Sequence, residues 1–549
     1  MARHGPSLPL SDEQARAVAL AERGGDGAVV ARAGSGKTHT LRAVAERTAP
    51  RRTLLLAFNR AIAREAARRL PDHVRVTTVH ALAYRALVRP DARLRAKVAA
   101  GDGGVPPRAW LDLAGLAARD PDRHQHVAAL TALLRGFLAS DDAEPRADHL
   151  PAPLRSELAE RLGRARARDR ERWLALRTRR AWLRMIDRDD PAPLSHDGYL
   201  KLFALGRPRL DAGLLLVDEA QDLAPGMLGI LARQSSPRLL VGDPAQRIYG
   251  WRGAVDAMAA SGFPEVRLTA SFRFGPEIAA AAQRALRVLS PRASLRGAGP
   301  PGRVDAGPWA GDGPRTVLCR SNVGLIDAAV AVGEGGLHAV GGLEGTLGAL
   351  DGAYRLWTRR NAPRSGRDGA ARIETERPPD AGLLAGVGSW RELCTAAEAH
   401  GGPLRTLQRL VERHGDGVPA LRRGLRRAER RREEDARVVL STVHRAKGRE
   451  WDRVELWSDL SRVPRDSADL ARAPDPEAAR AEANLLYVAV TRARRRLGVG
   501  RLRDDLQELL GAPDPEDRPS RPTPAPAPDR ADAGAAQPSQ ASRARRAVS

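Results

Sequence analysis

The short stretch from Ala33 to Thr38 constrains the fold of this chain more than any other feature of its sequence. It reads Ala-Gly-Ser-Gly-Lys-Thr and lies between an apolar run at residues 28–30 and a helix-like segment at residues 39–47. The glycines allow the backbone to curl so that successive N–H groups point at a phosphate, and the helix adds the positive end of its dipole. The order of strand, glycine loop and helix therefore predicts an α/β fold that binds a nucleotide.

The lysine of this loop is unusual for the chain. Among 91 Lys and Arg residues, the lysines are Lys37, Lys97, Lys201 and Lys447. A compact ammonium suits a phosphate as a point charge, so we expect Lys37 to reach the β- and γ-phosphates of the nucleotide. We expect the hydroxyl of Thr38 to hold Mg²⁺. The alternative is a glycine turn beside a surface lysine.

Two further apolar runs end in polar residues that a phosphate loop requires. The run at residues 214–217 leads into Asp218 and Glu219, and the run at residues 239–242 leads to Gln246. We expect Asp218 to hold Mg²⁺ and Glu219 to orient and deprotonate the attacking water. Gln246 is placed to sense the γ-phosphate. For the two acids, the alternative is an acidic strand end in a loop.

Tyr249 and Trp251 are conspicuous because aromatic residues make up only 4% of the chain. Each ring can stack a nucleobase, which is worth about 1–3 kcal/mol per base. An aromatic pair usually belongs to a core, but the neighbouring Arg and Gly residues suggest a loop and favour contact with nucleic acid. Arg273, farther along the chain, is a candidate for a second phosphate contact.

The formal net charge of +24 is the strongest bulk property of the chain. It suggests a polyanionic partner, most simply nucleic acid, although Arg-rich codon usage is an alternative source of the charge. Two cysteines, Cys319 and Cys394, are too few for a disulfide framework, which fits a reducing cytoplasm. Because we find neither a membrane-length apolar run nor a signal-peptide core, we expect a cytoplasmic protein without a membrane partner.

The other apolar runs suggest strands of a parallel sheet, because they lack the alternation of a half-exposed strand. Residues 53–58 and 75–79 are expected as strands, and residues 59–70 as an amphipathic helix. Residues 89–208 are expected to be helical, and we leave open whether their charged faces are only solvated or face DNA. A second α/β unit is expected to begin near Thr316.

Five motifs in a fixed order resemble the superfamily 1 helicases of the UvrD/Rep type. They are AGSGKT, VDEAQD, GDPAQRIYGWRGA, TVHRAKGREW and LLYVAVTRA, and the match extends from Gln14 to about Leu497. The segments SFRFGPEIA and AFNRAIARE are most similar to the F-box DNA helicase branch. We identify no F-box near the N-terminus, so we expect only the motor to carry the resemblance.

The resemblance implies an α/β P-loop NTPase with two RecA-like parallel-sheet motor domains and helical insertions. We expect the first motor domain at residues 1–90 and 205–270, and the second at residues 271–360 and 436–510. Between their halves we expect a helical insertion at residues 91–204 and a short basic insertion at residues 361–435. Residues 511–549, rich in Pro, Ala and Arg, are expected to be a disordered tail.

The resemblance also implies roles for single residues of the nucleotide site. Gln14 corresponds to the glutamine that reads adenine, and Glu450 to the ribose contact. Arg273 and Arg492 correspond to the arginines that reach the γ-phosphate, so the implied catalytic set is Lys37, Glu219, Gln246, Arg273 and Arg492. The implied ATP-binding set is Gln14, Ala33, Gly34, Ser35, Gly36, Lys37, Thr38, His39, Phe272 and Glu450.

Two residues of that set depart from the family pattern. His39 stands where an arginine near the base is common, and Phe272 stands where a tyrosine stacks on adenine. Phe272 retains the aromatic face and lacks the hydroxyl. The implied metal ligands are Thr38 and Asp218, and the implied DNA contacts are Asn59, Thr78, His80, Tyr249, Trp251, Arg252, Thr442 and His444.

The implied function is an ATP-dependent DNA helicase or translocase that uses ATP and Mg²⁺. It would move 3′→5′ on single-stranded DNA and unwind tailed duplex in repair or recombination, with a monomer as the working expectation. One alternative is a translocase that displaces proteins from single strands without unwinding, which the short insertions suggest. A nucleic-acid-binding regulator without catalysis is disfavoured by the intact site residues. A helicase–nuclease is disfavoured because we find no acidic cluster after Arg492.

Overall fold

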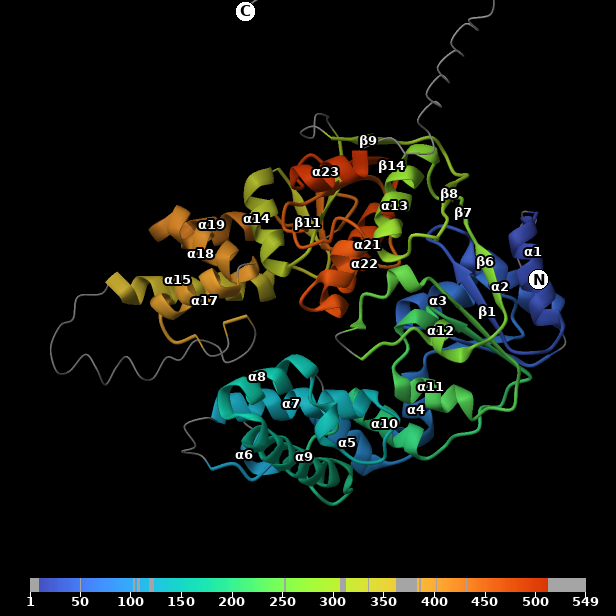
Figure 1. Ribbon diagram of the computed structural model, residues 1–549, viewed down its shortest axis with the longest axis horizontal. Coiled ribbons are helices and arrows are strands. Elements are labelled where there is room, and N and C mark those ends of the chain that lie inside the picture. Colours follow the sequence, from blue (N-terminus) through green and yellow to red (C-terminus); the bar gives the residue numbers. More distant parts are fainter. Residues whose placement is uncertain are drawn as a thin grey trace, which may run out of the picture. The chain divides into compact units, whose positions relative to one another are not determined.

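The computed structural model describes most of the chain before residue 512 (Figure 1). The described residues are 9–49, 51–101, 104–105, 109–117, 123–250, 253–306, 313–333, 335–361, 383–384, 387–400, 402–430 and 432–511. Trp251 and Arg252 lie outside these residues, as does the expected disordered tail.

The first parallel sheet surrounds the predicted phosphate loop. Its strand order is β3 (Val74–Thr77), β2 (Thr53–Leu56), β4 (Leu214–Asp218), β5 (Arg238–Gly242), β1 (Gly27–Ala31) and β6 (Glu265–Leu268). Every pairing in this sheet is parallel, and β1 pairs with both β5 and β6. All residues of β1, β2 and β4 are buried, which explains why their sequences run apolar without alternation.

Helices cover both faces of this sheet. On one face α1 (Asp12–Glu22), α2 (Lys37–Arg47) and α3 (Arg60–Arg69) pack against alternate strand residues, which include Val29, Leu55, Leu216 and Val241. The intervening strand residues, among them Val30 and Leu56, join the core of the opposite face, which includes residues of α11 (Pro225–Ala232) and α12 (Ala257–Ser261). Successive strand side chains thus reach two different cores.

Helices fill the described part of residues 91–204. After α4 (Val79–Ala83) and a π-helical turn (Tyr84–Val88) come α5 (Ala92–Ala100), α6 (Ala109–Leu113), α7 (Arg123–Ala139), η2 (Ala147–His149), α8 (Ala152–Leu162), α9 (Arg164–Ile186) and α10 (His196–Leu205). Helix α9 packs against α7 and α8, and α10 packs against α4 and α7 (Figure 1). Trp110, Phe137 and Trp182 belong to the core that these helices share with the first sheet.

The second sheet is parallel as well. Its strand order is β11 (Leu337–Ala339), β12 (Val438–Thr442), β10 (Arg315–Cys319), β13 (Trp451–Leu456), β14 (Ala493–Gly498) and β9 (Arg303–Asp305). The other elements of this part are α13 (Pro276–Leu289), α14 (Asn322–Val332), α20 (Val443–Ala446), α21 (Ser467–Arg472), α22 (Pro476–Val490) and α23 (Asp504–Gly511). We call this part, including residues 273–343 and 436–511, the second lobe, and the first sheet with α1–α3, α11 and α12 the first lobe.

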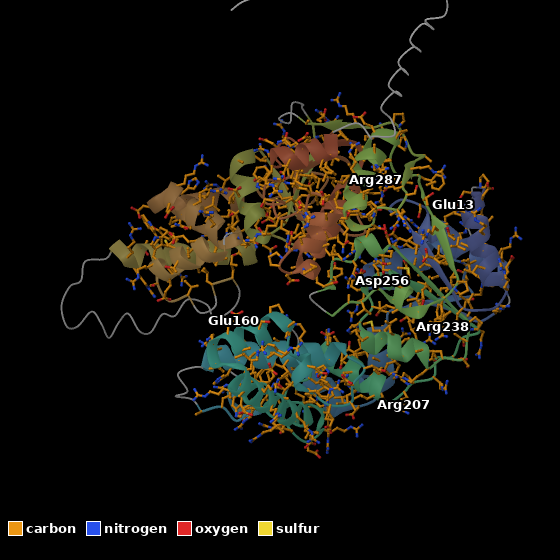
Figure 2. All side chains as sticks on the ribbon, viewed as in Figure 1. Glu13, Glu160, Arg207, Arg238, Asp256 and Arg287 are labelled. Atoms are coloured by element: carbon orange, nitrogen blue, oxygen red, sulfur yellow. The ribbon has the colours of Figure 1, made fainter. Side chains whose placement is uncertain are left out.

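The chain crosses from the first lobe to the second just after β6. There a two-stranded ladder forms between β7 (Ala270–Ser271) and β8 (Arg296–Gly297). The carboxylate of Glu13, labelled in Figure 2, accepts hydrogen bonds from the backbone N–H and the hydroxyl of Thr269, at 2.7 and 2.6 Å. Helix α1 of the first lobe is thereby fastened to the crossing segment.

A second group of helices interrupts the second lobe. It consists of α15 (Glu344–Asn361), α17 (Trp390–His400), α18 (Gly402–His414), η6 (Gly415–Gly417) and α19 (Val418–Ala428). Helix α15, which we expected within the second motor domain, packs against α17, α18 and α19 (Figure 1). Helix α15 also packs against α14, and residues of the group share one core with residues of the second sheet, among them Leu347 and Leu440.

The two parallel sheets confirm the predicted fold class, an α/β chain with two RecA-like domains. Within the described ranges, no helix is long and apolar enough to cross a membrane.

Candidate nucleotide and nucleic-acid site

The phosphate loop has a backbone that only glycine adopts easily. Gly34 and Gly36 have φ of 75° and 81°, in the left-handed region. A Cβ on Gly34 would approach the Ser271 hydroxyl to 2.4 Å, and a Cβ on Gly36 would approach Nε2 of Gln14 to 2.6 Å. The backbone conformation favours glycine at both positions, and at Gly34 a Cβ would also approach Cβ of Arg273 to 2.6 Å. Helix α2 begins directly after the loop, at Lys37.

Gln14 joins helix α1 to this loop. Its Oε1 accepts from the N–H of Ser11 at 3.0 Å, while its Nε2 donates to the carbonyl oxygen of Ser35 at 3.0 Å. The Ser35 hydroxyl is buried and has no hydrogen-bond partner among the described residues, as is also true of Nε2 of His39. The N–H of Phe272 donates to the Gly34 carbonyl at 2.9 Å, and the Phe272 side chain stays 47% exposed.

The two predicted acids lie against the loop lysine. Nζ of Lys37 is 2.6 Å from Oε1 of Glu219, and Nζ of Lys447, from the second lobe, is 3.6 Å from Oε2. Burial alone would raise the pKa of Glu219, but these two ammonium groups hold it well below its usual range. Burial, with the charge of Glu219 beside it, raises the pKa of Asp218 to about 6.

Glu219 also has an uncommon backbone. Its φ of 54° and ψ of 42° place a non-glycine residue in the left-handed region. This conformation turns the chain sharply between β4 and the short 3₁₀ turn η3 (Ala220–Asp222). Strain of this kind persists where the surrounding structure enforces it, often at functional sites.

Arg492 is buried at the junction of the two lobes. It is 2% exposed, and its Nη2 donates to Oε1 of Gln246 at 3.2 Å. Burial, together with the charge of Arg273, lowers the pKa of Arg492 to about 9. Helix α22 ends at Val490, and Arg492 follows its capping residue Thr491.

Arg273 lies close to the same place. Its Nη1 donates to the carbonyl oxygen of Thr491 at 2.8 Å, and its Nε is 2.5 Å from Oε2 of Glu450. Oε1 of Glu450 is also 3.7 Å from Nη1 of Arg494. The structure thus brings the two predicted arginines and the predicted ribose contact into one group.

The site contains residues that sequence reasoning missed. Nζ of Lys447 is ion-paired with Asp222, donates to the Gln246 carbonyl at 2.8 Å and lies 5.4 Å from the centre of the Tyr249 ring. Burial raises the pKa of Asp222 to about 6 in spite of this lysine. The scarcity of lysine in the chain and the place of Lys447 within the motif TVHRAKGREW were sequence signals that could have identified it.

Three of the predicted DNA contacts line one pocket of about 840 Å³. These are Tyr249, Thr442 and His444, and Arg320 and Arg445 line the same pocket. The Tyr249 ring stacks on Phe58 with centres 5.2 Å apart, and its hydroxyl donates to the His444 carbonyl at 3.3 Å. Burial, with Arg320 nearby, lowers the pKa of His444 to about 4.

Three other predicted DNA contacts do not line that pocket. The side chains of Asn59 and Thr78 cap α3 and α4, where they accept from backbone N–H groups at 2.9 and 3.1 Å. His80 lies 3.2 Å from the carboxylate of Asp197. The first two residues therefore have a local structural role that needs no DNA.

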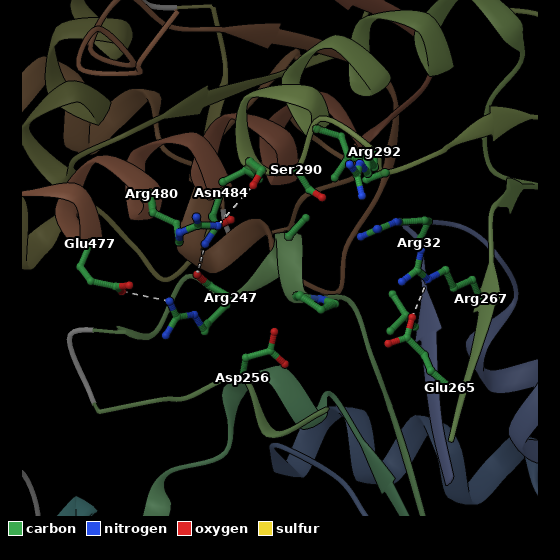
Figure 3. Close-up of a pocket in the computed structure, with 16 residues that line it drawn as sticks. Arg32, Arg247, Asp256, Glu265, Arg267, Ser290, Arg292, Glu477, Arg480 and Asn484 are labelled. Atoms are coloured by element: carbon green, nitrogen blue, oxygen red, sulfur yellow. Dashed lines mark hydrogen bonds and ion pairs between the residues drawn. The ribbon is translucent and has the colours of Figure 1, made fainter. Parts of the chain in front are cut away.

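A second pocket of about 640 Å³ lies between the two lobes (Figure 3). Arg32, Arg247 and Arg267 line it from the first lobe, and α22 contributes Arg480 and Asn484. Within it, Nδ2 of Asn484 donates to the carbonyl oxygen of Arg247 at 2.8 Å. Glu477 of α22 also pairs with the Arg247 side chain, with Oε2 and Nη2 3.0 Å apart.

Comparison with known proteins gives two family matches. Residues 14–252 match a family described as an AAA domain, and residues 398–502 match the UvrD-like helicase C-terminal domain. The first match begins at Gln14 and contains the phosphate loop and both acids, and the second contains Lys447 and Arg492.

Individual relatives agree with these matches. The chain is 30% identical over 521 residues to F-box DNA helicase 1 of Gallus gallus, which covers 89% of this chain and 49% of the relative. It is 28% identical over 506 residues to F-box DNA helicase protein 1 of Schizosaccharomyces pombe, covering 85% and 55%. ATP-dependent DNA helicase UvrD2 of Mycobacterium tuberculosis is 28% identical over 323 residues, covering 51% and 46%.

The chain thus spans about half the length of the relatives it matches. The first family match contains β1–β5 of the first sheet, and the second contains β12–β14 of the second sheet. The chain belongs to the UvrD-like superfamily 1 helicases, close to the F-box DNA helicases.

Proposed function

We propose that this chain is an ATP-dependent DNA helicase that hydrolyses ATP to move on single-stranded DNA and unwind duplex. The observation that carries the proposal is that both lobes contribute to one group of residues. Lys37 pairs with Glu219 in the first lobe, and Arg492 of the second lobe donates to Gln246 of the first. The relatives named as DNA helicases support it.

In this proposal each charged group has one task in hydrolysis. Lys37 binds the β- and γ-phosphates, and Glu219, kept ionised by its lysine neighbours, accepts the proton of the attacking water. Arg273 and Arg492 neutralise the charge that develops on the γ-phosphoryl group. An arginine supplied from a second domain can contribute about 10³–10⁵ in rate.

Thr38 and Asp218 are the residues that we propose to hold Mg²⁺. A hydroxyl and a carboxylate supply the hard oxygen ligands that Mg²⁺ prefers. Burial raises the pKa of Asp218, and a bound cation would favour its ionised form. When bound, Mg²⁺ would supply charge neutralisation at the phosphates.

The remaining roles follow from exposure and contacts. We propose that Phe272, which is largely exposed, stacks on adenine, while Gln14 reads the base edge and Glu450 contacts the ribose. We propose that the pocket lined by Tyr249, Thr442 and His444 belongs to the single-strand path. Movement 3′→5′, a role in repair or recombination and a reducing, cytoplasmic setting are also proposals, the last supported by the free thiols of both cysteines.

The domain division is proposed as the sequence suggests. We assign residues 1–90 and 205–270 to the first motor domain and residues 271–360 and 436–510 to the second. The contact of α15 with α14 supports placing α15 in the second motor domain.

One experiment tests the motor and its catalytic carboxylate. Glu219→Gln keeps the shape of the side chain and removes its basicity, so we expect DNA-stimulated ATPase to fall by about 10²–10⁴-fold while ATP still binds. Lys37→Ala is expected to lose both the DNA-stimulated ATPase activity and the binding of ATP. The measurements are ATPase rates with and without single-stranded DNA and the affinity for a non-hydrolysable ATP analogue. Glu344→Gln, on the second helical group, is the control.

Wild-type protein without DNA-stimulated ATPase would exclude the proposed function, and full activity of Glu219→Gln would remove that residue from its role. Duplexes with 3′ and with 5′ single-stranded tails then report polarity.

A translocase that strips proteins without unwinding is the second candidate. The observation that favours it is the small size of the second helical group, whose helices run from Glu344 to Ala428. Displacement of a protein block from single strands, measured beside strand separation, distinguishes the two functions.

A further inference from the structure

One face of helix α22 contacts the segment at residues 243–247 of the first lobe. Asn484 and Tyr487, three residues apart and so on one side of the helix, contact Arg247 and Asp243 respectively. Arg492, just beyond the helix, contacts Gln246. The second lobe therefore reaches both ends of residues 243–247, the segment that contains the predicted phosphate sensor.

Tyr487 makes the most buried of these contacts. Its side chain is fully buried, and its hydroxyl donates to Oδ2 of Asp243 at 3.1 Å. The same hydroxyl oxygen accepts from the N–H of Ala33, in the phosphate loop, at 3.4 Å. Burial and the neighbouring Asp243 raise the pKa of Tyr487 well above its usual value, so the phenol keeps the proton that it donates.

Asp243 connects Tyr487 to Gln246, because it accepts a hydrogen bond from each of them. Oδ1 of Asp243 accepts from Arg32 at 2.8 Å, and Oδ2 accepts from Nε2 of Gln246 at 2.9 Å. Because Oε1 of Gln246 accepts from Arg492, the amide is held in one orientation from both ends. The remaining N–H of that amide is the group left to meet a phosphate or a water.

We propose that Tyr487 is a positioning residue that fixes the phosphate loop and the Gln246 amide when the two lobes are together. Its hydroxyl bridges Ala33 of the loop and Asp243, and Asp243 orients Gln246. The side chain touches neither nucleotide nor DNA in this scheme and acts through these two partners. The inference rests on the proposed function for its effect on hydrolysis, but the contact itself can be measured without any activity.

Tyr487→Phe tests the inference, because it removes the hydroxyl and keeps the ring that packs in the core. We expect kcat of DNA-stimulated hydrolysis to fall about tenfold, the effect of one lost hydrogen bond to a charged group, while KM for ATP stays within about twofold. Tyr354→Phe is the matched control, because its hydroxyl also donates to an aspartate, Asp416, at 3.4 Å, but within the second helical group.

Hydrogen exchange of the phosphate-loop peptide provides the second measurement. The Ala33 amide loses its acceptor in Tyr487→Phe, so we expect this peptide to exchange about tenfold faster than in wild type and in Tyr354→Phe. An unchanged kcat, or unchanged exchange in a folded variant, overturns the inference. If the peptide exchanges faster in Tyr487→Phe than in wild type but wild type hydrolyses no ATP, the proposed function is overturned and the hydrogen-bond bridge through Tyr487 is established.

Discussion

Glu219 has two cationic neighbours, and they belong to different lobes. Lys37 lies 2.6 Å from one carboxylate oxygen and Lys447 lies 3.6 Å from the other. Its left-handed backbone stores strain of about 1–3 kcal/mol, which these contacts help to offset. We expect an incoming triphosphate to draw Lys37 away, so that Lys447 remains as the cation beside the base. The second lobe would then influence how strongly Glu219 binds a proton.

His444 gives a prediction about pH. Its pKa is lowered to about 4 in the folded chain, against about 6.5 for an unperturbed histidine. Between these values the unfolded chain binds a proton that the folded chain does not. The associated stability is complete above pH 6.5 and is lost as the pH falls, by up to about 1.4 kcal/mol per pH unit.

We therefore expect the free energy of unfolding of wild type, minus that of His444→Gln, to shrink between about pH 7 and pH 5. Denaturant unfolding of both proteins at several pH values measures this difference in the free energy of unfolding. His338→Gln, in β11, is the control for loss of an imidazole. A difference that stays constant with pH would contradict the lowered pKa of His444.

At the scale of elements, helix α1 combines a cap with the glutamine that we propose to read adenine. Ser11 and Gln14 form a capping box, in which each side chain bonds the backbone N–H of the other residue. The same Gln14 amide also donates to Ser35 of the phosphate loop. The start of the helix therefore sets the orientation of the glutamine expected to read adenine.

Ser11→Ala tests this coupling. Loss of an N-cap lowers the free energy of unfolding by about 0.5–2 kcal/mol. We also expect KM for ATP to rise, because the Gln14 side chain loses the cap that holds its helix turn. Ser195→Ala removes the equivalent cap of α10, whose hydroxyl accepts from Gly198 at 3.1 Å, and should cost similar stability without changing KM. Equal KM values for Ser11→Ala and Ser195→Ala would show that the cap of α1 does not influence nucleotide binding.

At the scale of the whole molecule, polar side chains tie the two lobes together. Lys447 of the second lobe reaches Asp222 and the Gln246 carbonyl, while the Tyr249 hydroxyl of the first lobe reaches the His444 carbonyl. These bonds join the candidate nucleotide site to the pocket that we assign to the single-strand path. The proposed motor needs such a connection, because closure of the nucleotide site has to change the position of groups in the pocket for the single strand.

Lys447→Met tests the connection. It leaves the buried carboxylate of Asp222 without its cation, and breaking a buried pair in this way typically costs about 3–5 kcal/mol. We expect the lobes to separate, with a larger radius of gyration in X-ray scattering and a lower DNA stimulation of ATPase. Arg426→Gln breaks an exposed pair with Glu344 inside the second helical group and serves as control. An unchanged radius of gyration would show that other contacts hold the lobes.

The predictions from sequence agree most closely with the structure for features that depend on a short run of neighbouring residues. The phosphate loop, the acids after β4 and the glutamine after β5 were all found from an apolar run followed by particular polar residues. The parallel sheet was predicted from strands without alternation, and those strands are buried on both faces. Where the second insertion begins stays a prediction, because α15 packs both against α14 of the second lobe and against the helices that follow it.

By itself, the sequence determined the nucleotide loop, the two-sheet α/β fold and the family, because each depends on residue order over short distances. Tertiary structure decided which distant groups meet. Ala33 and Tyr487, or Asp222 and Lys447, are hundreds of positions apart, and only folding brings them within hydrogen-bond reach. It also decided that Arg492 is buried, since burial depends on the lobe packed against it. The physical reason is that contacts and desolvation depend on which groups are neighbours in the folded structure, whereas a motif depends only on the order of nearby residues along the chain.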